Sequence, residues 1–181
     1  MIEAMVAKRY ARALLSLALD KDKKTIDVYA MQLKTFDQVL TEHKALLPTL
    51  TNRYFDLFAR EHVIEEIGKL LNFDSEVKNF LKLLIHKGRI EIFSFIKNEF
   101  LTLSNQTMNR EPMTVVSAVE LPEEQYQALK EFFTKKTGKE IIPTKKIDPT
   151  VIGGVRVHIG DVVYDDTLET QIEKMKQRLV A

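Results

Sequence analysis

Cysteine and tryptophan are absent from this chain of 181 residues, and glycine and proline number only six and five. Without cysteine the chain forms no disulfide and offers no thiolate nucleophile or cysteine-ligated zinc site. No apolar run approaches the ~20 residues that a membrane-spanning helix needs. The N-terminal residues also lack the apolar core and cleavage site of a signal peptide. We therefore expect a soluble intracellular protein.

An excess of either charge is also missing. Lys plus Arg number 27 and Asp plus Glu number 26, so the formal net charge is +1. Nucleic-acid binding needs a concentrated basic footprint, and the basic clusters here, such as those at 8–12 and 21–24, are short and mixed with acidic or apolar residues. We expect no nucleic-acid partner. RNA binding is kept as an alternative because a small β-α-β sheet can form an RNA platform.

The patterns typical of catalysis and cofactor binding are missing too. The four histidines, at 43, 62, 86 and 158, have no clustered partner that would form a metal or acid–base site. The chain contains no G-x-G-x-x-G, G-x-x-x-x-G-K-[ST] or G-x-S-x-G motif. We expect no catalytic residue, no cofactor and no metal, and so no enzyme.

What the chain does have is helical periodicity in its first part. Hydrophobic residues make up 45% and charged residues 29%, a globular composition. Apolar spacings of three and four predict helices over 4–19, 24–41, 43–48, 52–67, 74–87 and 89–104. Because their connections are short, we expect a six-helix bundle over residues 1–106. Pro48 should end the third helix, Asn52 and Gly68 should bound the fourth, and Gly88 should end the fifth.

The period changes after a polar stretch that Pro112 closes, and residues 107–112 are predicted to be a linker. Strands are expected over 114–119, 139–147, 155–159 and 162–164, and helices from 121 to 137 and from 166 onwards. Pro143 should hold its strand at a sheet edge, and Asp166 should cap the closing helix. The fold class is therefore α+β, with a small β-α-β-β-β-α domain over residues 113–181.

Two of the predicted helices, 4–19 and 74–87, are apolar over more than the ~100° stripe that a bundle helix needs. Either these helices are central and buried on all sides, or one flank of each lines a groove that accepts an amphipathic helix from another protein. Alanines at 7, 11, 13 and 18 favour the groove, because small side chains allow a visiting helix to approach closely.

Three stretches of the sequence resemble a known family. Tyr10-Ala11-Arg12-Ala13-Leu14 resembles the Y-A-x-A-L signature of the delta subunit of bacterial and chloroplast F-type ATP synthase, whose mitochondrial counterpart is the oligomycin-sensitivity-conferring protein. Residues 79–90 resemble the mid-chain helix and turn of that family. Residues 152–165 are similar to its I-G-G-x-x-x-x-x-G-D-x-x-x-D-G-S pattern, with Asp166-Thr167 where the family commonly has Gly-Ser.

The resemblance implies a non-catalytic peripheral-stalk (stator) subunit of a proton-translocating F-type ATP synthase, which links the catalytic head to the membrane sector and resists rotor torque. It implies that residues 1–106 bind the N-terminal helix of the alpha subunit and that residues 113–181 bind the C-terminal region of the b subunit. The subunit would lie on the cytoplasmic side of the bacterial inner membrane, held there only through the complex. The alternative is an RNA-binding or other helix-binding adaptor protein. Carried onto this sequence, the alpha contacts are expected at Tyr10, Ala13, Leu14, Leu17, Val77, Phe80, Leu83 and Leu84.

Overall fold

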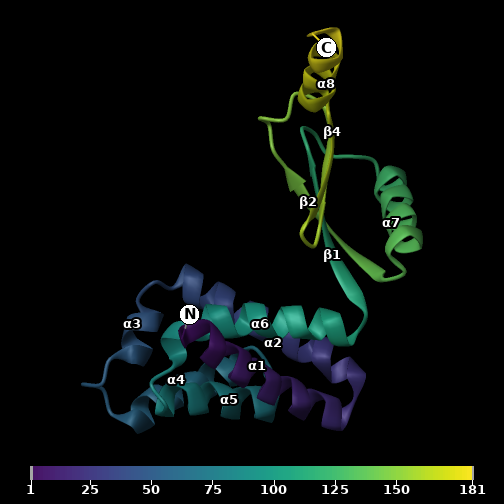
Figure 1. Cartoon of the computed structure of the whole chain (residues 1–181). Helices are drawn as coiled ribbons and strands as arrows, with labels where there is room; N and C mark the ends of the chain where they lie inside the picture. Colours follow the sequence, from purple (N-terminus) through teal and green to yellow (C-terminus); the bar gives the residue numbers. More distant parts are fainter. Residues whose placement is uncertain (1, 181) are drawn as a thin grey trace. The chain divides into compact units, whose positions relative to one another are not determined.

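The chain is helical in its first part and mixed in its second. The computed structural model describes the backbone of residues 2–180 and the side chains of residues 3–177. It divides into two units, Met1–Ser104 and Asn105–Ala181 (Figure 1). Over the described residues there are eight α-helices and one four-stranded sheet, which confirms the α+β class.

The first unit is built from helices with short connections. These are α1 (Ile2–Lys21), α2 (Lys23–Glu42), α3 (Leu46–Thr51), α4 (Leu57–Leu70), α5 (Ser75–His86) and most of α6 (Phe93–Thr107), which follows a 3-10 turn at Ile90–Ile92. Their apolar stripes meet in one core. Tyr29 and Phe36 of α2 are fully buried, and the Phe36 ring packs edge-on against Phe93 with centroids 4.9 Å apart. Burial of such large side chains is the main favourable term in folding this unit.

Three predicted helix boundaries in this unit, at Pro48, Asn52 and Gly68, are wrong. Pro48 lies inside α3, where it is tolerated because residues of a first helical turn donate no intrahelical N–H bond. Asn52 does not begin α4. Its side-chain oxygen instead accepts the N–H of Tyr54 at 2.9 Å in a local turn, and α4 starts at Leu57 with Asp56 as N-cap.

Gly68 was expected just past the end of α4 but lies within the helix. It is buried there, and a Cβ at this position would stand 2.5 Å from the Lys78 side chain, so the glycine leaves space for the aliphatic part of this α5 lysine against α4. The left-handed residue that ends α4 is Asn72, with φ of 53°. The N–H groups of Asn72 and Phe73 donate back to Lys69 and Gly68, which satisfies the last carbonyls of the helix.

The predicted end of α5 is confirmed. Gly88 has φ of 63°, a backbone conformation that favours glycine. The Gly88 and Arg89 N–H groups donate to Ile85 and Leu84, which is the same arrangement that closes α4.

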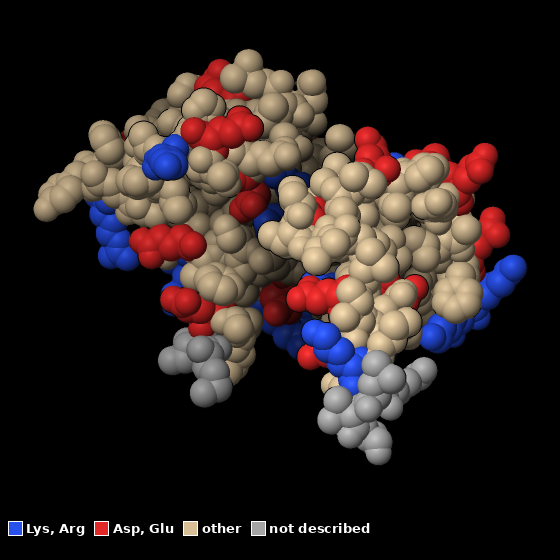
Figure 2. All heavy atoms as spheres, turned by 90° about the horizontal axis from the view of Figure 1, so that it is seen from above, with Lys and Arg blue, Asp and Glu red and all other residues tan. Residues whose placement is uncertain are grey.

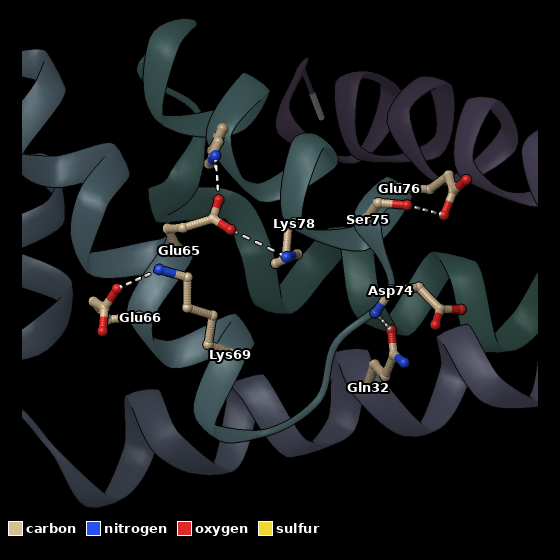
Figure 3. Close-up of polar contacts among 9 residues, drawn as sticks. Gln32, Glu65, Glu66, Lys69, Asp74, Ser75, Glu76 and Lys78 are labelled. Atoms are coloured by element: carbon tan, nitrogen blue, oxygen red, sulfur yellow. Dashed lines mark hydrogen bonds and ion pairs between the residues drawn. The ribbon is translucent and has the colours of Figure 1, made fainter.

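Ion pairs join α4 to α5 near the contact between Gly68 and Lys78. The Glu65 carboxylate accepts hydrogen bonds from Lys82 and, at 3.1 Å, from Lys78 (Figure 3). These two ammonium groups lower the pKa of Glu65 to about 2. These ion pairs therefore connect the polar faces of α4 and α5, in addition to the packing of their buried side chains.

The second unit is a sheet with a helix on one face. Its elements are β1 (Arg110–Ser117), α7 (Glu123–Thr137), β2 (Glu140–Ile147), β3 (Gly154–Ile159), β4 (Val162–Thr167) and α8 (Leu168–Val180). The sheet order is β2-β1-β3-β4, with β1 and β2 parallel and the other pairs antiparallel. Tyr126 and Phe133 of α7 pack on Val115, Ile141 and Val157 of the sheet, which forms a core separate from that of the first unit. Pro143 lies in the edge strand β2, as its missing N–H predicts.

The predicted linker over 107–112 differs from the structure. Helix α6 runs to Thr107, and β1 already begins at Arg110, so Pro112 lies in a strand. Pro112 is tolerated there because β1 pairs only with β2 at this position, and the pairing with β3 begins at Met113.

The cap of α8 is Thr167 and not Asp166. The Thr167 hydroxyl accepts the Thr170 N–H at 3.4 Å, and the Asp165 carboxylate accepts the N–H and hydroxyl of Thr167 at 3.0 and 2.7 Å. These bonds, together with a 2.7 Å pair to Arg156, hold the pKa of Asp165 well below its usual range. Asp166 accepts a bond from Gln171 instead.

Candidate helix-binding groove

An apolar groove of about 660 Å³ lies between α1 and α5. Its floor and walls are made by apolar side chains at helical spacing on the two helices. They are Val6, Tyr10, Ala13, Leu14 and Leu17 of α1 and Phe80 and Leu83 of α5. The groove therefore lies on the flanks that the sequence predicted to be apolar beyond the needs of a core.

Specific contacts hold the two helices at this spacing. The Tyr10 and Phe80 rings meet edge-on with centroids 6.4 Å apart. Lys21, at the end of α1, pairs with Glu76, at the start of α5, at 2.6 Å. That pair, the backbone N–H of Glu76 itself and the Ser75 hydroxyl lower the pKa of Glu76 to about 2. The ion pair joins the last turn of α1 to the first turn of α5, so the groove is fixed at one end by a charge contact and further along by an aromatic one.

Six of the eight predicted contact residues line this groove. Leu17 and Leu83 are open to solvent, at 48% and 43% exposure, whereas Phe80 and Leu14 are buried and form the floor. Tyr10 and Ala13 complete the set on α1. Apolar side chains as exposed as these two leucines are the ones from which a visiting helix would remove water.

Val77 and Leu84 do not line the groove. Both are fully buried and belong to the core of the first unit, because their positions on α5 face inward, away from Leu83. The alanine argument is also wrong for Ala7, Ala11 and Ala18, which are fully buried. Their small side chains serve packing within the chain, and only Ala13 among the four lines the groove.

Polar residues, which apolar spacing does not predict, also line the groove. Arg9, Glu76, Asn79, Lys87 and Arg89 line it, together with the apolar Val6. Helical spacing from Tyr10 and Leu83 identifies Val6, Asn79 and Lys87 as neighbours on the same faces. Arg89 lies beyond the end of α5, where helical spacing gives no information.

Metal-binding groups and membrane-spanning helices are two other features that the described residues could contain. Among them, no group of three or more His, Cys, Asp or Glu side chains is placed to hold a metal ion. No helix in the described range is long and apolar enough to cross a membrane. On the face seen in Figure 2, acidic and basic side chains are interspersed among wide uncharged areas, and no broad basic area is visible over its described residues.

Comparison with known proteins identifies the family. The family model described as "ATP synthase delta (OSCP) subunit" matches residues 6–179. The chain belongs to this family. It is 33% identical over 179 residues to the ATP synthase subunit delta of Desulfotalea psychrophila, covering 99% of this chain and 98% of that protein. It is 32% identical over 181 residues to the ATP synthase subunit delta of a Geobacillus species, covering 99% of each.

A solved structure shares the fold. A chain in the cryo-EM structure of the Toxoplasma gondii mitochondrial ATP synthase hexamer matches with a TM-score of 0.68 over 97% of both chains, at 15% identity. As a member of the delta (OSCP) family, the protein is a peripheral-stalk (stator) subunit of an F-type ATP synthase. Membership of this family supports the stator role over the alternative of an RNA-binding or other helix-binding adaptor protein. In the complex the subunit is peripheral to the membrane.

Proposed function

We propose that the α1–α5 groove holds the N-terminal helix of the alpha subunit. The observation that carries this proposal is that six residues predicted as alpha contacts line one open apolar trough. An amphipathic helix laid in such a trough would bury its apolar face against Leu17 and Leu83 over the floor made by Phe80. Its polar face would stay in water.

A stator subunit needs slow dissociation rather than chemistry. Affinity differences among related complexes lie mostly in the rate of dissociation, and buried apolar contacts at the centre of an interface give the largest losses when they are removed. We therefore propose a mechanical, non-catalytic role, in which the helical bundle formed by α1–α6 is one attachment point.

The second attachment point in this proposal is the second unit, which would bind the C-terminal region of the b subunit. In this unit α8 exposes Leu168, Ile172 and Met175 at spacings of four and three, so an apolar helix face is available for a partner. The subunit would then join head and membrane sector from the cytoplasmic side of the bacterial inner membrane, without contacting lipid.

The groove can be tested with Leu83→Asp. A carboxylate at this exposed wall position would lie against the apolar face of the visiting helix, and burying it without a partner is costly. Calorimetry with the N-terminal segment of the alpha subunit from the same complex should show affinity weakened by more than about 30-fold, the size of a hot-spot loss.

Met31→Asp is the matched control, because Met31 is exposed on α2 and lies outside the groove. It should leave the affinity within about twofold of the unchanged protein, and both variants should keep the helical circular dichroism of the original chain. Equal affinity for the Leu83 and Met31 variants would show that the alpha segment binds elsewhere.

A further inference from the structure

A second pocket, of about 390 Å³, lies where the α3–α4 loop and α4 meet the end of α5. Its lining contains charged side chains as well as aliphatic ones, whereas the lining of the groove is mainly apolar. Arg53, Arg60 and Lys87 are its cationic side chains, and Glu91 is the one carboxylate among its lining residues. No ion pair of Arg53, Lys87 or Glu91 is present among the described residues. With three cationic side chains and one carboxylate, the pocket lining carries an excess of positive charge.

Arg60 is one of these cationic side chains, and its hydrogen bonds are incomplete. One of its terminal nitrogens donates to the Leu50 carbonyl at 3.3 Å, but its Nε is buried and has no hydrogen-bond partner. A buried guanidinium N–H without an acceptor is unfavourable and rare in folded proteins. Carboxylate and phosphate oxygens are the acceptors that best match the planar donors of a guanidinium group.

Arg53 reaches the same pocket from a different element. Its Nη2 stands 3.4 Å from the point that a Cβ on Gly88 would occupy. The Arg53 guanidinium therefore lies beside the turn that closes α5. Two guanidinium groups, from the α3–α4 loop and from α4, thus line one pocket beside Lys87.

We propose that this pocket is an oxyanion-binding site that takes one carboxylate or phosphate group on Arg53 and Arg60. The surroundings favour a carboxylate presented by a partner protein. Tyr54 and Phe58, at 100% and 75% exposure, lie in the loop and helix that supply the two arginines, and exposed aromatic and arginine side chains together are typical of interface hot spots.

The position of Lys87 suggests which partner segment brings the carboxylate. Lys87 lines both this pocket and the α1–α5 groove. A segment that leaves the groove at this end would pass directly to the arginines. This source of the carboxylate rests on the proposed function, whereas the oxyanion site itself does not.

Two titrations of the full chain test the site and separate the sources. The first adds inorganic phosphate at constant ionic strength and follows the backbone amide signals of Leu50 and Gly88 by NMR. The second measures the affinity of the alpha N-terminal segment by calorimetry. The variants are Arg53→Gln and Arg60→Gln, and the control is Arg12→Gln, which removes the same charge from an exposed position outside both pockets.

A phosphate titration that saturates in the unchanged chain and weakens about tenfold in both pocket variants, but not in the control, supports the site with free phosphate as a ligand. A similar loss confined to the alpha segment supports the site with a carboxylate as its ligand. If the Arg60→Gln variant unfolds because it loses the hydrogen bond to Leu50, the Arg53→Gln variant alone still tests the site. If neither the phosphate affinity nor the affinity for the alpha segment falls in the pocket variants, the proposal is overturned. Phosphate binding without any binding of the alpha segment would uphold the site and overturn the proposed function.

Discussion

Glu65 shows how a single side chain can make the stability of the first unit depend on pH. Its carboxylate takes hydrogen bonds from Lys82 and Lys78, and its pKa falls from 4.5 to about 2. Because the folded state lowers this pKa, the contribution of Glu65 to stability is present above the unfolded value near 4.5. It is lost as the pH falls from there towards 2. The α4–α5 contact should therefore weaken in acid.

Glu65→Gln tests this. At pH 7 the variant should unfold at a lower urea concentration than the unchanged chain, because an amide cannot form the two ion pairs. The difference between the two midpoints should shrink steadily from about pH 5 downwards, as Glu65 of the unchanged chain gains its proton. Circular dichroism during urea titration at several pH values gives both quantities.

Glu61→Gln is the control on the same helix, since Glu61 has no ion pair among the described residues. Its urea midpoint should stay close to that of the unchanged chain at every pH. A Glu65 effect that stays constant between pH 7 and pH 3 would show that the ion pairs do not stabilise the fold.

Two glycines in turns of the second unit differ in why a side chain is unfavourable there. One is restricted by its backbone angle alone, and the other by its backbone angle and by a steric contact. Both Gly138, after α7, and Gly154, at the start of β3, have positive φ. A Cβ on Gly138 would meet nothing within 4 Å, but a Cβ on Gly154 would stand 2.3 Å from the Asp166 carbonyl oxygen of β4. The first glycine is needed for its backbone angle alone, and the second is needed for the close approach of two strands as well.

Gly138→Ala should lower the free energy of unfolding by about 1 kcal/mol, the usual cost of a left-handed alanine. Gly154→Ala should lower it by about 3 kcal/mol or more, because the β3–β4 backbone must also move apart. Urea unfolding of the two variants measures the difference. Equal losses would mean that β4 can shift without cost and that the close approach is unimportant.

Local signals explain which elements the sequence could predict. The end of α5 follows from Gly88 because a left-handed ending is encoded by one residue. The start of α4 does not follow from Asn52, because asparagine caps helices and closes turns equally well, and the fold uses it for a turn. The position of Gly68 inside α4 does not follow from local signals, because its surroundings include Lys78 of another helix.

The groove was predictable in part for the same reason. Helical spacing identifies the apolar flanks of α1 and α5, but it does not say which flank each helix buries. Ala7 and Val77 were therefore counted as available although the fold buries both. That α1 lies beside α5 at all is a long-range contact, fixed by packing and by the Lys21–Glu76 pair, and spacing along the chain contains no information about it.

At the scale of the whole molecule, each unit has its own core. Phe36 and Phe93 lie in the first, and Val115 and Phe133 lie in the second. The groove and the arginine pocket are formed entirely by residues of the first unit. A unit of this size buries enough surface to fold by itself, so attachment to the alpha subunit should need no residue of the second unit.

A fragment of residues 1–108 tests this, because it keeps α6 whole to Thr107 and ends before β1 begins at Arg110. It should unfold in a single cooperative transition and bind the alpha N-terminal segment within about twofold of the full chain, as measured by calorimetry. The same fragment with Leu83→Asp should lose that binding, which shows that the groove is still the site. A folded fragment with much weaker binding would mean that the second unit contributes to holding the alpha subunit.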